Sequence, residues 1–114
     1  MKNNFHNQSI GKVGEDLAVT YLEENHYRII DRNFNTKVGE IDIIAIKNDI
    51  IYCIEVKTRS STMYGQPYEA INYKKLNRMK HTALIYAKQS NYQGELKLLL
   101  VSIIGKNCSL LEIE

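Results

Sequence analysis

The order of apolar and polar residues in this 114-residue chain predicts two helices and five strands. Between residues 10 and 26 the apolar side chains recur at helical spacing, which predicts an amphipathic helix. Its buried stripe is expected at Val13, Leu17, Ala18, Tyr21 and Leu22. A second helix is predicted from an N-cap at Asn72 to about Gln89, because apolar residues again recur every three or four positions. Its expected stripe is Leu76, Met79, Ala83, Tyr86 and Ala87.

Five other segments are rich in β-branched, aromatic and leucine side chains and are bounded by turn residues, as strands are. They cover residues 27–34, 39–47, 50–58, 96–104 and 108–113. The third is apolar on both faces, which is typical of a central strand covered on both sides. The order α-β-β-β-α-β-β predicts an α/β fold, in which a central mixed β-sheet is flanked by α-helices.

Length and composition limit the classes of protein to which this chain can belong. The chain is long enough for one domain, which we place at residues 10–114 after a polar, flexible arm at residues 1–9. Its apolar runs, such as residues 98–101, are far too short to cross a membrane, and the N-terminus lacks an apolar signal region. We therefore expect a cytoplasmic protein without a membrane partner. Cys53 and Cys108 form no C-x-x-C motif, which favours free thiols over a disulfide.

The second and third strands bring acidic side chains together. If Asn48 and Asp49 form a two-residue turn, the hairpin register sets Asp42 opposite Glu55 and Glu40 opposite Lys57. Carboxylates whose Cβ atoms are about 5 Å apart repel each other unless one is protonated or a cation lies between them. Oxygen ligands without a neighbouring His or Cys favour Mg²⁺, with Mn²⁺ as its substitute.

Two acids with a lysine on the same face suit the hydrolysis of a phosphodiester bond. A bound metal ion lowers the pKa of a water molecule and stabilises a phosphoryl oxygen, and Lys57 could orient that water. The alternative is a structural ion pair between Glu40 and Lys57 in a protein that binds no metal.

Net charge, at +2, does not decide whether the partner is a nucleic acid, but the distribution of charge is informative. The second predicted helix gathers basic residues opposite its apolar stripe, and no acid occurs between Ala70 and Gly94. The basic side chains are Lys74, Arg78, His81 and Lys88. This face suits a phosphate backbone, although a solvated helix surface has the same pattern. The loop at residues 60–66 follows the predicted site and is either a substrate-contacting segment or an ordinary connection.

Glu15 lies on the flank of the apolar stripe of the first helix, and Gly11 and Gly14 leave room for a close approach. Helical mechanics alone favours a structural interpretation, in which an acid in the first turn interacts with the helix dipole.

Several motifs, in order, resemble those of the YraN-type family of small bacterial proteins. They are Gly11-x-x-Gly14-Glu15-x-x-Ala18, Gly39-Glu40-Ile41-Asp42-Ile43-Ile44, Ile54-Glu55-Val56-Lys57-Thr58-Arg59 and Tyr64-Gly65-x-Pro67-x-Glu69-Ala70, followed by Lys75 and Arg78. That family is similar to the restriction-endonuclease-like (PD-(D/E)xK) superfamily and to archaeal Holliday-junction resolvases.

The resemblance implies a role for each matching residue. Asp42 and Glu55 would bind the metal, Lys57 would be the catalytic lysine, and Glu15 would be the helical acid of the resolvase branch, now catalytic and metal-binding rather than structural. Two positions depart from the family pattern: the fourth strand has Leu99 where an Asp is usual, and His26 stands where a glycine usually precedes the tyrosine.

Together these observations predict a Mg²⁺-dependent nuclease acting on DNA, branched or single-stranded. Phosphates would be held by Arg59, Lys74, Lys75 and Arg78. The alternative is a non-catalytic nucleic acid binding protein that retains the fold. The sequence does not distinguish DNA from RNA, and a homodimer stays open because resolving branched DNA generally needs two symmetric copies.

Overall fold

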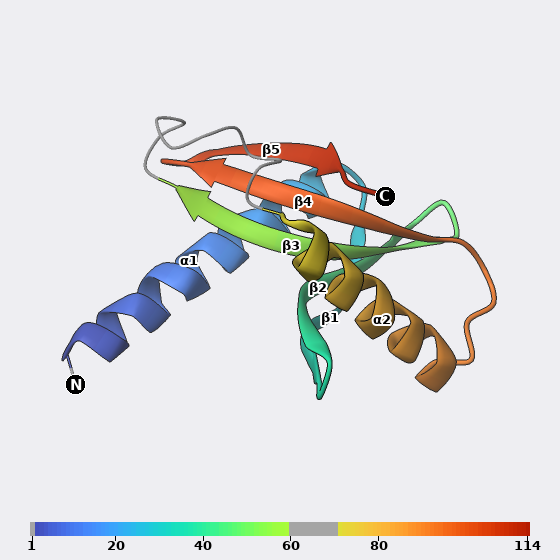
Figure 1. The fold of residues 1–114 in the computed structure, drawn as a ribbon. Helices are drawn as coiled ribbons and strands as arrows, with labels where there is room; N and C mark the ends of the chain where they lie inside the picture. The colour runs from blue at the N-terminus through green and yellow to red at the C-terminus, as the bar shows by residue number, and fades with distance from the viewer. Residues whose placement is uncertain (1, 60–70) are drawn as a thin grey trace.

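The fold is a five-stranded mixed sheet with one helix on each face (Figure 1). It is described here from a computed structural model, which covers residues 2–59 and 71–114 and describes side chains from Gly11 onward. The elements are α1 (Lys2–Glu24), β1 (Arg28–Thr36), β2 (Gly39–Lys47), β3 (Ile50–Arg59), α2 (Tyr73–Gln89), β4 (Leu96–Ile104) and β5 (Asn107–Glu112). Their order confirms the predicted α-β-β-β-α-β-β arrangement and the α/β fold class.

The strands lie in the sheet in the order in which they occur in the chain, β1-β2-β3-β4-β5. Only β3 and β4 are parallel, and α2 connects them, as a parallel pair requires. β3 is therefore the central strand, as its apolar residues on both faces predicted. The turn between β2 and β3 is also confirmed, because Lys47 pairs with Ile50 and both Asn48 and Asp49 adopt positive φ.

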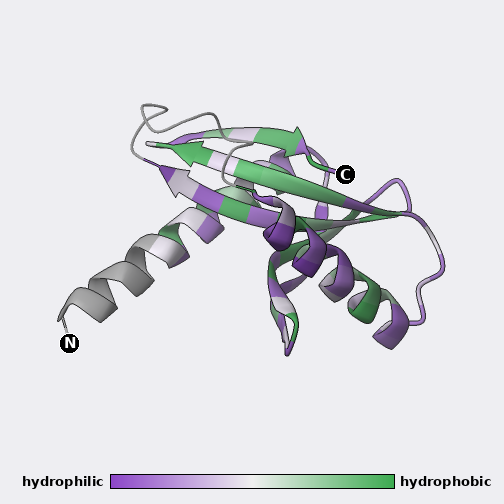
Figure 2. Ribbon diagram, viewed as in Figure 1, coloured by the Kyte–Doolittle hydropathy of each residue, from purple (hydrophilic) through white to green (hydrophobic). Residues whose placement is uncertain are grey.

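Each helix covers a separate core on its own face of the sheet. Under α1, the buried side chains of Ala18 and Leu22 pack against β2, β3 and β4. Under α2, Met79 and Ala83 pack against Ile44 and Cys53 on the opposite face. The hydropathy colouring shows β4 as largely apolar, with polar residues along much of α2 (Figure 2).

The helix α1 ends in a Schellman motif that accounts for one departure from the family pattern. His26 adopts φ 72°, its N–H donates to the Glu23 carbonyl, and the Tyr27 N–H donates to the Leu22 carbonyl, both at 3.0 Å. Glycine is favoured at a position with this left-handed backbone conformation. The position therefore suits the glycine that the resemblance implies where this chain has His26.

Some boundaries and burials differ from the prediction. α1 begins at Lys2 rather than at residue 10, while the flexibility expected of residues 1–9 stays a prediction. Val13 is 58% exposed because the helix buries Ala18 and Leu22 instead, and Gly14 is the residue that approaches Thr58. On α2, Thr82 is fully buried although it lies outside the predicted stripe, because its hydroxyl donates to the Arg78 carbonyl.

Three further predictions concern the cysteines, membrane-spanning helices and the loop after β3. Cys53 and Cys108 are free thiols. Within the described ranges, no helix is both long and apolar enough to span a membrane. The loop at residues 60–66, and the motif from Tyr64 to Ala70, lie outside the described residues.

Candidate functional site

The pairing of β2 with β3 stops just before the predicted site. Regular register runs from Lys47 with Ile50 to Ile43 with Ile54 and ends there. Ile41 packs under α2 whereas Ile43 packs under α1, although residues two apart share a face in a regular strand. β2 therefore twists through Asp42. The paired register therefore ends one residue short of the predicted Asp42–Glu55 pair, and neither this pair nor Glu40–Lys57 is part of the ladder.

Asp42 nevertheless reaches β3 through its side chain. The Val56 backbone N–H donates to Asp42 Oδ2 at 2.8 Å, so the carboxyl takes the place of the missing main-chain contact. The Asp42 carboxyl also lies close enough to the Glu55 carboxyl for Glu55 to raise its pKa. The two acids therefore meet, as the sequence predicted, by a route that the register did not predict.

Burial, together with the neighbouring Glu55, raises the pKa of Asp42 from 3.8 to about 8. Burial is the largest cause, followed by the hydrogen bond to Glu55 and the negative charge of Glu55, while the Val56 N–H acts in the opposite direction. Protonation of one carboxyl group is one of the two ways in which we expect the repulsion between paired carboxylates to be relieved.

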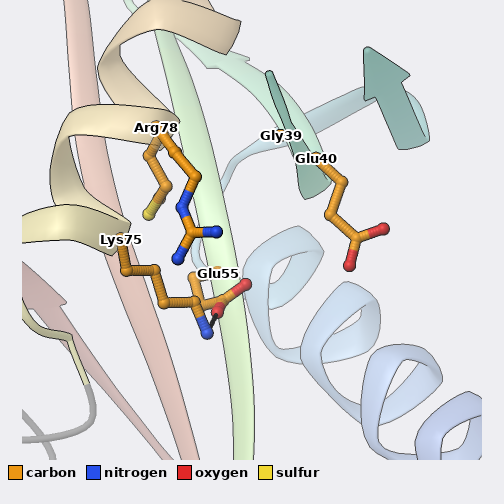
Figure 3. A pocket seen from close by; sticks show the side chains of 6 residues that line it. Gly39, Glu40, Glu55, Lys75 and Arg78 are labelled. Atoms are coloured by element: carbon orange, nitrogen blue, oxygen red, sulfur yellow. Dashed lines mark ion pairs between the residues drawn. The ribbon is translucent and has the colours of Figure 1, made fainter. Parts of the chain in front are cut away.

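A nearby cation is the other way, and α2 supplies one. The Lys75 ammonium forms an ion pair with Glu55, whose side chain is only 8% exposed (Figure 3). The pair borders a cleft of about 200 Å³ into which the Arg78 guanidinium also points. The cleft is lined by Gly39, Glu40, Glu55, Lys75, Arg78 and Met79.

Lys57 follows Glu55 on the same face of β3 and is partly buried. Within the described ranges it belongs to no ion pair, so the alternative of a structural Glu40–Lys57 pair is not what this structure contains. Its register partner on β4 is Ser102. The Ser102 hydroxyl is buried and has no hydrogen-bond partner in the described part of the chain.

Glu15 comes close to Asp42 but has other partners. Its carboxylate accepts hydrogen bonds from Arg32 at 3.4 Å and from Asn33 at 3.3 Å. Arg32 also donates to Asp16, at 2.9 Å. The negative charge of Glu15 still contributes, as the smallest cause, to the raised pKa of Asp42. No group of three or more acidic, His or Cys side chains in the described ranges could hold a metal ion, so Glu15 does not complete a three-ligand set here.

The basic face of α2 is present as predicted. The side chains of Lys74, Arg78, His81 and Lys88 are all exposed. Arg78 lines a second cleft as well, which runs past Gly39 to the turn between β1 and β2 and includes Lys37. Gly39 allows this arrangement, because a Cβ there would lie 3.3 Å from Arg78 Cβ and 3.0 Å from Thr82 Oγ1. Arg59 ends β3, beyond Lys57.

The side chains of Asp42 and Glu55 fit a Mg²⁺ ion in their chemistry. Mg²⁺ is commonly bound by one or two carboxylates together with several water molecules. Glu55 already accepts a cationic group, the Lys75 ammonium, which acts as a stand-in for a cation at this position. Asp42 is oriented by the Val56 N–H, which is the kind of supporting contact that metal-binding carboxylates have.

The sequence predicts a phosphate-binding role for Lys75, and its contact with Glu55 was not predicted. A signal existed, because Lys75 precedes Met79 by four residues and Thr82 by seven, which places it on the buried stripe of α2. A lysine in line with a buried stripe indicates a partner inside the protein. Arg32, which holds Glu15 together with Asn33, was also missed, because no sequence spacing connects it to α1.

Comparison with known proteins places the chain in a family. The model of the family described as "Uncharacterised protein family UPF0102" matches residues 14–104. A UPF0102 protein of Alkaliphilus oremlandii is 53% identical over 89 residues, which are 78% of this chain and 75% of that protein. A UPF0102 protein of Persephonella marina is 43% identical over 98 residues, or 85% of this chain and 84% of that protein. The resemblance to the YraN-type proteins is thus confirmed: the chain belongs to the UPF0102 family.

Proposed function

We propose that this protein is a metal-dependent nuclease that hydrolyses phosphodiester bonds in DNA. The observation that carries the proposal is the buried contact between the Asp42 and Glu55 carboxyl groups, with Lys57 next on the same face of β3. Paired carboxylates in a protein interior need a compensating charge, and a divalent ion would supply that charge and also give the pair a chemical task. The α/β fold is consistent with the restriction-endonuclease-like superfamily, in which such sites occur.

Each residue of the site would have a separate task. Asp42 and Glu55 would hold a Mg²⁺ or Mn²⁺ ion, which when bound supplies a lower pKa for a water molecule and stabilises a phosphoryl oxygen. Lys57 would hold the attacking water or offset the charge that develops on the phosphate. Glu15 would act from behind Asp42 through its charge.

The DNA strand would lie over the cleft between β2 and α2. Arg78 lines both adjoining clefts, so it is placed to contact a phosphate that follows the scissile one. Lys74 and Lys75 start α2 beside it, and Arg59 ends β3. These positive side chains would neutralise the backbone without reading the sequence of the bases.

The test is a cleavage assay on branched and single-stranded DNA with Mg²⁺ or Mn²⁺. Lys57→Ala should lower the cleavage rate at least about 100-fold while leaving DNA binding in place. The matched control is Lys106→Ala, in the exposed turn between β4 and β5, which should cut at the wild-type rate. Cleavage that Lys57→Ala does not reduce would come from a contaminating nuclease and would contradict the proposal.

A second candidate, a nucleic acid binding protein without catalysis, is favoured by one observation. The proton on Asp42 and the Lys75 ammonium on Glu55 already compensate the two carboxyl groups without a metal ion. This candidate predicts salt-dependent binding that survives Asp42→Asn and Glu55→Gln, and no cleavage with any divalent metal.

A further inference from the structure

Lys75 occupies a place at Glu55 that a divalent cation would also need. Its position is fixed by the start of α2, where the Asn72 side chain accepts a hydrogen bond from the Lys75 backbone N–H at 2.8 Å. From there the side chain extends along the cleft, and its ammonium ends at the Glu55 carboxylate (Figure 3). The Lys75 side chain is 30% exposed, so its ammonium can move into solvent without unfolding of the helix.

Among the ion pairs of the described residues, Lys75 is the cation that pairs with Glu55. A carboxylate that is 8% exposed and touches a second carboxyl group depends on a nearby positive charge. A divalent ion bound to the same carboxylate would repel an ammonium at contact distance. The two cations would therefore compete for Glu55.

We infer that Lys75 is an internal competitor of the divalent ion, an inference that rests on the proposed metal site. Without the ion, Lys75 is the counter-charge of Glu55. When the ion binds, the Lys75 ammonium leaves Glu55 and remains in the cleft beside Arg78. It then adds a second positive charge where a phosphate of the substrate would bind, so ion binding prepares the cleft for an anion.

As a competitor of the metal ion, Lys75 is a positioning residue whose removal should change two binding affinities in opposite directions. Removing a lysine that only binds phosphate would leave the affinity for a free metal ion unchanged. Removing a competitor should raise that affinity, since the ion no longer displaces an ammonium. Loss of DNA binding and gain of metal binding in one variant is the pattern that a merely structural lysine would not produce.

The experiment is calorimetric titration of the full chain with Mn²⁺, without nucleic acid. Lys75→Gln should bind Mn²⁺ at least about fivefold more tightly than the wild type, as expected when an ion pair to a carboxylate is removed. Lys74→Gln is the matched control, because it removes the same charge from the adjacent exposed residue, and it should change the affinity less than about twofold. Lys75→Arg should bind with nearly wild-type affinity, because it keeps the competing charge.

Other outcomes would separate the inference from the proposed function. Wild type and Lys75→Gln binding Mn²⁺ equally, or Lys74→Gln binding as tightly as Lys75→Gln, would overturn the competitor role and leave the metal site standing. No Mn²⁺ binding by any variant would overturn the metal site itself, and the competitor role with it. If Lys75→Gln does not fold, nuclear magnetic resonance of the Lys75 side-chain ammonium in the wild type tests whether the ion displaces it. The ammonium signal should shift when Mg²⁺ is added, and an unchanged signal at saturating Mg²⁺ would overturn the inference.

Discussion

Asp42 Oδ2 lies 2.8 Å from the backbone nitrogen of Val56, at the point where the pairing of β2 with β3 ends. The Asp42 side chain of β2 therefore contacts the β3 backbone where the main-chain pairing of the two strands has ended. The same carboxyl group lies beside Glu55. Asp42 therefore both links β2 to β3 and has the raised pKa of the candidate site.

The stability of the protein should fall as the pH rises from about 4 to about 8. Asp42 has its pKa raised from 3.8 to about 8 in the folded state, so across that range the folded chain keeps a proton that the unfolded chain releases. Unfolding then releases a proton, and one proton changes the free energy of unfolding by up to about 1.4 kcal/mol per pH unit. Below pH 4 both states are protonated and above pH 8 both are ionised, so the dependence on this group disappears.

Urea denaturation of the wild type and Asp42→Asn at several pH values checks this dependence. The side-chain amide of the variant cannot ionise, and its oxygen still accepts the Val56 N–H, so the variant should lose most of the slope between pH 5 and 7. Equal slopes in both proteins would assign the pH dependence to other groups.

Glu15 offers a test of a role that the resemblance implies and the geometry leaves open. Glu15→Gln should weaken Mn²⁺ binding about two- to tenfold if its charge supports the ion at Asp42, because the Glu15 charge acts on Asp42. Asp16→Asn is the matched control: it removes the same charge one residue away and also breaks a contact with Arg32, but should leave Mn²⁺ affinity unchanged. Calorimetry on both variants decides, and equal effects would assign Glu15 to the structural contact with Arg32.

The sequence predicted the hairpin well because its determinants are local. Asn48 and Asp49 tolerate the left-handed conformation that a two-residue turn requires, and alternating apolar residues fix the register beside it. Asn72 likewise marked the start of α2 through its own hydrogen bond to the Lys75 N–H. These signals are carried by residues within a few positions of each other.

The rest of the site depends on contacts between distant segments, which no local pattern encodes. The ladder could be counted only while the strands stayed paired, and it fails at Asp42 because a side chain replaces the main chain there. The contact of Lys75 with Glu55 depends on how α2 crosses from β3 to β4. The holding of Glu15 by Arg32 depends on how α1 packs on the sheet. The hairpin count brought Asp42 and Glu55 together but carried no information on these partners.

His26 should be a site where a glycine stabilises the protein. The residue adopts φ 72° at the end of α1, a conformation that costs about 1 kcal/mol for a residue with a Cβ and nothing for glycine. His26→Gly should therefore raise the free energy of unfolding by about 0.5 to 1 kcal/mol, in the direction of the family pattern. Glu24→Gly, inside the last turn of the same helix, should lower it by a similar amount. Chemical denaturation of the two variants gives both values, and a destabilised His26→Gly would mean that the histidine side chain has a contact worth more than the strain.

Arg78 should carry a larger share of nucleic acid binding than any basic residue farther along α2. It lines both clefts beside the candidate site, whereas Lys88 lies ten residues later on the same basic face, about 15 Å along the helix axis. A single-stranded oligonucleotide of about six nucleotides bound at the cleft would neutralise Arg78 and leave Lys88 largely solvated. Arg78→Gln should weaken binding uniformly across sequences and reduce the slope of log affinity against log salt by about 0.7, the value for one phosphate of a single strand. Lys88→Gln should leave that slope unchanged. Fluorescence anisotropy over a series of salt concentrations measures both slopes, and an equal decrease in the two variants would place the strand along the whole basic face of α2 instead of at the cleft.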